Sequence, residues 1–81
     1  MKEFVTRLEG KTVMSEDGQL LGVLVDFLVE SRTGRLESML VEPAESLDLR
    51  QFRTDPNGRL VLPVKAMRSV RDVIIARTRP P

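Results

Sequence analysis

Apolar residues occur in short runs along the chain, and each run ends at a glycine, a proline or a polar turn sequence. The longest run covers residues 20–30, is rich in valine and leucine, and has no helical spacing of polar positions, which predicts a β-strand. Residues 31–34 end in Gly34 and predict a tight turn, after which a second strand is expected over 35–42. The two strands therefore form a predicted hairpin.

Three further strands are predicted over 11–14, 59–62 and 73–76, because each segment is short, apolar and bounded by turn-forming residues. A short helical turn is expected over 64–69, and the segment 44–54 fits either a loop or one helical turn. Five to six short antiparallel strands at intervals of about ten residues predict an all-β fold, either a small barrel or a sandwich.

Both faces of the strand at 20–30 are apolar. Strict alternation gives two sets of residues, Leu21, Val23, Val25, Phe27 and Val29 on one face and Leu20, Leu24 and Leu28 on the other. A small barrel buries only one face of a strand, so the other face needs a cover of its own.

Two interpretations of that second face remain open. In the first, the loop 44–54 folds over it and covers it with Leu47, Leu49 or Phe52. In the second, Val23 and Val25 belong to an exposed patch that pairs with a second copy of the chain or with another protein.

A length of 81 residues supports one domain, expected over 1–81 with its core at about 6–77 and a frayed tail at 78–81. The chain contains no Cys and no His, which excludes disulfides, thiolate metal sites and histidine-based catalysis. The acidic residues Asp26 and Glu30 are expected to support the hairpin, so we predict no enzyme activity, no cofactor and no metal. Neither a membrane-spanning run nor a signal peptide is present, so a cytoplasmic location is expected.

Charge is distributed unevenly along the chain. Residues 1–45 contain five Lys and Arg against nine Asp and Glu, a balance of −4, whereas residues 46–81 contain eight against three, a balance of +5. The two halves either mix over one ordinary surface or give the molecule a basic side that meets an acidic partner. Six of the eight basic residues of the second half also suggest nucleic-acid binding as an alternative, and these six are Arg50, Arg53, Arg59, Lys65, Arg68 and Arg71.

The ordered set of turns and strands resembles the PRC-barrel family over residues 6–77. The segments that carry the resemblance are Leu8-x-Gly10-Lys11-x-Val13, Asp17-Gly18-x-x-x-Gly22, Asp26-Phe27-Leu28-Val29-Glu30, Thr33-Gly34-Arg35-Leu36, Leu62-Pro63-Val64 and Ser69-Val70-x-Asp72-Val73-Ile74-Ile75. One departure is informative: Val23 and Val25 occupy positions that are often charged in the family.

The resemblance implies a compact barrel used as a non-catalytic docking unit. PRC-barrels occur in the photosynthetic reaction-centre H subunit, in the ribosome maturation factor RimM and as free-standing archaeal proteins, some of which serve FtsZ-based cell division with the membrane-anchoring protein SepF. Similarity to the free-standing group implies an adaptor that forms a homodimer or higher oligomer and binds a SepF-like or PRC-barrel partner in the cytoplasm, including at the division site. The alternative is a RimM-like factor that contacts RNA or a ribosomal protein.

These considerations give one predicted partner-binding surface. Apolar contact is expected from Val23, Val25, Phe27 and Phe52, and steering of acidic partners from Arg50, Arg53 and Arg71.

Overall fold

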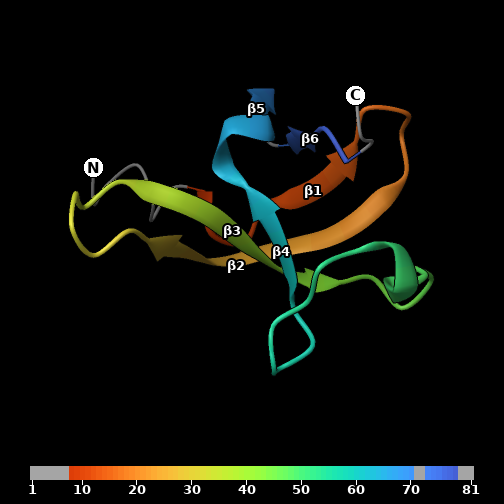
Figure 1. The fold of residues 1–81 in the computed structure, drawn as a ribbon. Helices are drawn as coiled ribbons and strands as arrows, with labels where there is room; N and C mark the ends of the chain where they lie inside the picture. The colour runs from red at the N-terminus through yellow and green to blue at the C-terminus, as the bar shows by residue number, and fades with distance from the viewer. Residues whose placement is uncertain (1–7, 71–72, 79–81) are drawn as a thin grey trace.

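The computed structural model describes residues 8–70 and 73–78, and these form one six-stranded sheet with two single-turn 3₁₀ helices (Figure 1). The elements in chain order are β1 (Thr12–Ser15), β2 (Leu20–Val29), β3 (Leu36–Pro43), η1 (Leu49–Gln51), β4 (Leu60–Pro63), η2 (Val64–Ala66), β5 (Met67–Val70) and β6 (Val73–Ala76). The strand order across the sheet is β4-β3-β2-β1-β6-β5. The predicted all-β fold is confirmed.

Two details differ from the prediction. The pair β1 and β6 is parallel, whereas the other neighbours in the sheet are antiparallel. The chain between these two strands makes the intervening strands before it returns, and such a long crossover permits parallel pairing. The predicted helical turn at 64–69 is shorter, because η2 ends at Ala66 and β5 begins at Met67.

The strand β2 does not alternate regularly between its two faces. Its ladder with β3 shifts register between Leu24 and Asp26, and its ladder with β1 also shifts register near its start. A bulge places an extra residue on one strand and reverses the facing of the residues beyond it. Leu21, Leu24 and Phe27 therefore all point into the core at a spacing of three, and the face assignment predicted from strict alternation is wrong.

Gly22 lies where β2 approaches β3 most closely. Its φ of +153° disfavours residues with a side chain, and a Cβ atom built there would lie 1.9 Å from the carbonyl oxygen of Glu42. Glycine is therefore required here by both backbone conformation and space.

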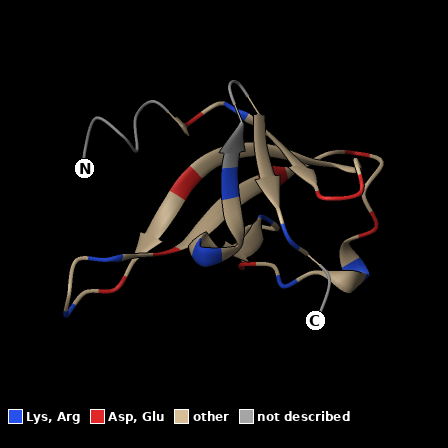
Figure 2. Ribbon diagram, turned by 90° about the horizontal axis from the view of Figure 1, so that it is seen from above, with Lys and Arg blue, Asp and Glu red and all other residues tan. Residues whose placement is uncertain are grey.

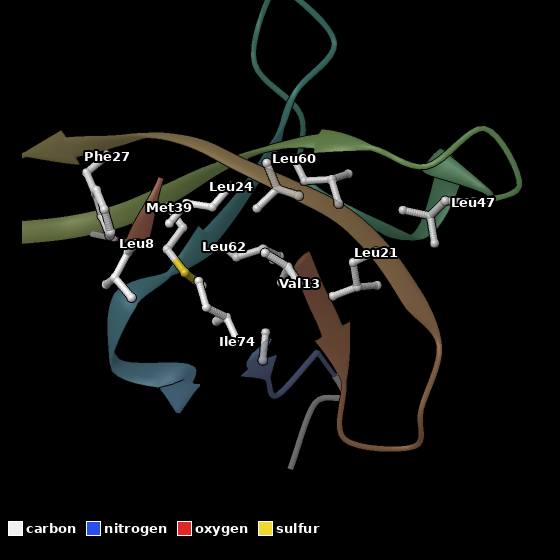
Figure 3. Packing of buried hydrophobic residues seen from close by; sticks show 12 residues of the cluster. Leu8, Val13, Leu21, Leu24, Phe27, Met39, Leu47, Leu60, Leu62 and Ile74 are labelled. Atoms are coloured by element: carbon white, nitrogen blue, oxygen red, sulfur yellow. The ribbon is translucent and has the colours of Figure 1, made fainter. Parts of the chain in front are cut away.

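The core lies between β2, β3, β4, β1 and β6 and contains twelve buried apolar residues (Figure 3). Leu47, from the loop 44–54, joins this cluster at the end occupied by Leu21, and Phe52 packs against it. The Ala44 N–H donates a hydrogen bond of 2.9 Å to the Leu21 carbonyl and ties the loop to β2. The loop thus closes the Leu21 end of the core with Leu47 and Phe52, and Leu49 is exposed. Leu20 and Val23 also stay exposed on the outward side of β2, so the interpretation in which this loop covers the second face of the strand is wrong.

Candidate docking surface

The outer wall of the sheet carries two rows of largely apolar side chains that cross β2, β1 and β6. In strand order, these rows are Leu20, Met14 and Ile75, and Val23, Thr12 and Val73. Residues directly opposite each other on neighbouring strands share a face of the sheet, so the rows form one surface. We call these six residues the outer patch.

The side chains of the outer patch are most exposed on β2. The exposed fraction is 45% for Leu20 and 41% for Val23, and the four residues on β1 and β6 are half-buried. Neighbouring strands lie about 4.8 Å apart, so three strands make a surface about 10 Å wide. Contiguous exposed apolar side chains of this kind are typical of interaction sites.

The predicted apolar contact residues of β2 separate in the structure. Val23 is exposed in the outer patch, and Val25 is half-buried at the bulge between Leu24 and Asp26. Phe27 is only 7% exposed and belongs to the core, because the bulge turns it inward. The prediction that Phe27 contributes to an exposed patch is therefore wrong, whereas partner binding by Val23 and Val25 stays a prediction.

The remaining predicted site residues lie mostly on the loop 44–54. Phe52 is half-buried against the core, and Arg53 is exposed, with its carbonyl oxygen accepting a hydrogen bond of 2.9 Å from the Val61 N–H. Arg50 is exposed in η1, and Arg71 lies outside the described residues. Their contribution to partner binding stays a prediction.

Arg50 is already paired within its own loop. Its Nε and Nη2 atoms donate hydrogen bonds of 3.0 Å to the two carboxylate oxygens of Asp48, and its backbone N–H donates one of 3.1 Å to the same side chain. These bonds lower the pKa of Asp48, with the Arg50 side chain as the larger cause, and the carboxylate raises the pKa of Arg50. The charge of Asp48 beside Arg50 therefore weakens the attraction of this arginine for an acidic partner.

The basic residues that the structure describes in the second half of the chain do not gather on one side. Arg59 is half-buried and lies 3.8 Å from Asp55, whereas Lys65 and Arg68 line a hollow between η2 and β6 together with Arg77. Figure 2 shows the basic segments of η2 and β5 close together. Sequence reasoning missed Arg77, since its partner Glu16 is 61 positions away and no local pattern links them.

Acidic side chains mainly support turns. The Glu30 carboxylate accepts hydrogen bonds of 3.1 Å from the backbone N–H groups of Arg32 and Thr33, as expected for the hairpin. Asp17 accepts a hydrogen bond from the Ser15 hydroxyl at the turn after β1. Within residues 8–70 and 73–78, no three His, Cys, Asp or Glu residues are grouped to hold a metal ion, and no helix is long and apolar enough to cross a membrane.

Comparison with solved structures gives a related fold. A protein described as the 16S ribosomal RNA processing protein RimM of Pseudomonas aeruginosa superposes with a TM-score of 0.63 at 25% sequence identity. The match covers 90% of this chain but 42% of that protein, so the chain spans less than half of its length. No curated protein matches the chain.

Family comparison covers almost the whole sequence. The family model of the PRC-barrel domain matches residues 1–80, which include all six strands of the sheet and both rows of the outer patch. This match covers far more of the chain than any single one of the short turn motifs does. The chain therefore belongs to the PRC-barrel domain family.

Proposed function

We propose that this chain is a non-catalytic docking module of the cytoplasm that binds a protein partner through the outer patch. The observation that carries the proposal is the exposure of Leu20 and Val23, two large apolar side chains on adjacent outward positions of β2. Burying such side chains against a partner contributes about 25 cal/mol for each Å² removed from water. Half-buried neighbours on β1 and β6 extend the contact.

Site-specific photo-crosslinking tests the docking surface directly. A benzophenone amino acid replaces Val23 in the chain expressed in its native cells, and a matched control carries it at Glu37, an exposed position on β3. We expect a discrete adduct from position 23 and none of that size from position 37. Equal adduct patterns from both positions would contradict the proposal.

A second experiment tests whether the partner contacts the outer patch or only lies near it. With the crosslinker at Leu20, the substitution Val23→Glu places a charge in the centre of the patch, and we expect it to remove the adduct. An adduct that survives this substitution would show that the patch does not form the interface. An adduct with the mass of two chains would identify the partner as a second copy of this chain, as expected for the predicted homodimer.

Two cellular settings are compatible with a docking module. The likeness to RimM supports ribosome maturation, in which the partner would be a ribosomal protein. The resemblance to free-standing archaeal PRC-barrels supports an adaptor in FtsZ- and SepF-based cell division. Sucrose-gradient sedimentation of the native extract distinguishes them: co-migration with small ribosomal subunits supports the first setting, and absence from those fractions with a SepF-like adduct at position 23 supports the second.

A further inference from the structure

A hollow of about 330 Å³ opens between η2 and the end of β6, beside the outer patch. Its lining includes Glu16, Lys65, Arg68, Ile75 and Arg77. The Arg77 N–H donates a hydrogen bond of 3.1 Å to the Ala66 carbonyl and fixes η2 against the end of β6. We call this hollow the basic pocket.

The basic pocket has an excess of positive charge. It contains three cations and one carboxylate, a balance of +2, and the single carboxylate of Glu16 lies 3.2 Å from the Arg77 Nε atom. Lys65 and Arg68 are exposed and form no ion pair with any described residue. Two cations are therefore available to an anionic ligand.

The pocket is continuous with the outer patch. Ile75 belongs to both, and its ladder partner on β5 is Arg68, so the row from Leu20 through Met14 and Ile75 ends at a cation. Ile75 is half-buried and provides an apolar surface next to the charges, whereas the half-buried Met67 packs against the core. A ligand that fills this surface needs apolar side chains followed by negative charge.

We propose that the basic pocket binds an acidic segment of the protein that docks on the outer patch, with carboxylates at Lys65 and Arg68 and an apolar side chain against Ile75. This inference rests on the proposed docking function and specifies the chemistry of the partner. A protein segment fits better than RNA, because base recognition usually adds exposed aromatic platforms. Of the phenylalanines that the structure describes, Phe27 is buried and Phe52 half-buried, while Phe4 lies outside the described residues, and the sequence contains no Trp or Tyr.

Fluorescence anisotropy with defined probes tests the chemistry. The probes are a fluorescein-labelled peptide of alternating leucine and glutamate, the matched peptide of alternating leucine and glutamine, and a labelled single-stranded RNA. Carboxylates accept stronger, charge-assisted hydrogen bonds from Lys and Arg than neutral amides do, so we expect the glutamate peptide to bind at least about tenfold more tightly than the glutamine peptide. We also expect added salt to reduce the difference.

Charge-removing variants locate the binding site. The double variant Lys65→Gln and Arg68→Gln removes two cations from the pocket, and Arg32→Gln with Arg35→Gln removes two exposed cations from the β2–β3 hairpin as a matched control. We expect the first to reduce glutamate-peptide affinity to the level of the glutamine peptide and the second to change it less than about twofold. Equal losses in both variants would show non-specific attraction and overturn the inference.

Two further outcomes also overturn it. The first is equal affinity for the two peptides, and the second is RNA binding tighter than glutamate-peptide binding that depends on Lys65 and Arg68. The crosslink from position 23 distinguishes failure of the acidic-segment inference from failure of the proposed docking function. If the pocket double variant retains that adduct, docking on the outer patch stands and only the acidic character of the partner is wrong.

Discussion

The two sides of β2 carry equally apolar residues, but one side is buried in the core and the other is exposed to solvent. Leu21, Leu24 and Phe27 are buried in the core, whereas Leu20, Val23 and Leu28 are 40–45% exposed. Hydrophobicity alone does not distinguish these sets, since leucine occurs in both. The difference comes from the backbone, whose register shifts select which side chains turn inward. One strand can therefore supply both the stability of the domain and a surface for a partner.

The largest expected effect is on the inner side. Leu24→Ala removes a fully buried side chain and leaves a cavity, so we expect the free energy of unfolding to fall by about 2–5 kcal/mol. The matched variant Leu28→Ala, on the outer side, should cost less than about 1 kcal/mol. Urea denaturation measures both, and equal losses would contradict the assignment of the two sides.

Gly22→Ala tests the backbone that creates the difference. The added Cβ atom would collide with the Glu42 carbonyl oxygen, and the positive φ would be strained, so β2 and β3 must move apart. We expect a loss of stability of about 1–3 kcal/mol. Gly34→Ala is the control: its φ is also positive, but a Cβ atom there meets nothing within 4 Å, so only the backbone strain remains. If Gly34→Ala destabilised the fold more than Gly22→Ala, close approach would not explain the requirement for glycine.

The substitution Val23→Glu tests whether the outer side of β2 serves partner binding and not the stability of the fold. The exposed position accepts a charged side chain, so the free energy of unfolding should change by no more than about 0.5 kcal/mol. Partner binding should nevertheless be lost, because the carboxylate would be desolvated at the interface. Val23 is a cleaner test than Val25, which is half-buried at the bulge. A large loss of stability in Val23→Glu would place this side chain in the core.

The smallest effect concerns the loop that covers the Leu21 end of the core. Its Asp48–Arg50 pair lowers the pKa of Asp48 in the folded state, so the stabilisation is present above the ordinary aspartate pKa and disappears as pH falls through the lowered value. Asp48→Asn should therefore lower the melting temperature slightly at pH 7 and not at about pH 2. High salt should also reduce the difference. The same decrease at both pH values would show that charge is not the cause.

Sequence reasoning reached the fold because the turn residues and short apolar runs are local signals. The strands at 20–30 and 35–42 appear in the structure as β2 and β3 with small changes at their ends. The helical turn predicted over 64–69 includes residues 67–69, and their pairing in β5 depends on β6, which is a tertiary contact.

The candidate site was harder to predict than the fold. Strict alternation assigned Phe27 and Val23 to one face, and only the register shifts of β2 separate them. The spacing of three between Leu21, Leu24 and Phe27 is the signal that would have indicated a bulged strand. Met14 and Met39 are chemically identical, yet Met39 is buried in the core and the ladder partner of Met14, Leu20, places Met14 on the outer wall. The pairing of a residue with neighbouring strands therefore decides which face of the sheet its side chain occupies.

Cysteine accessibility tests the central role of the outer patch most directly, because the natural sequence contains no cysteine and a single introduced thiol is the only reporter. Val23→Cys and Glu37→Cys variants are treated with a maleimide, once as purified chains and once in the assembled native extract. The account predicts that the thiol at position 23 reacts readily in the pure chain and is protected in the extract, while the thiol at position 37 reacts similarly in both. Equal reactivity at position 23 in the two samples would contradict it.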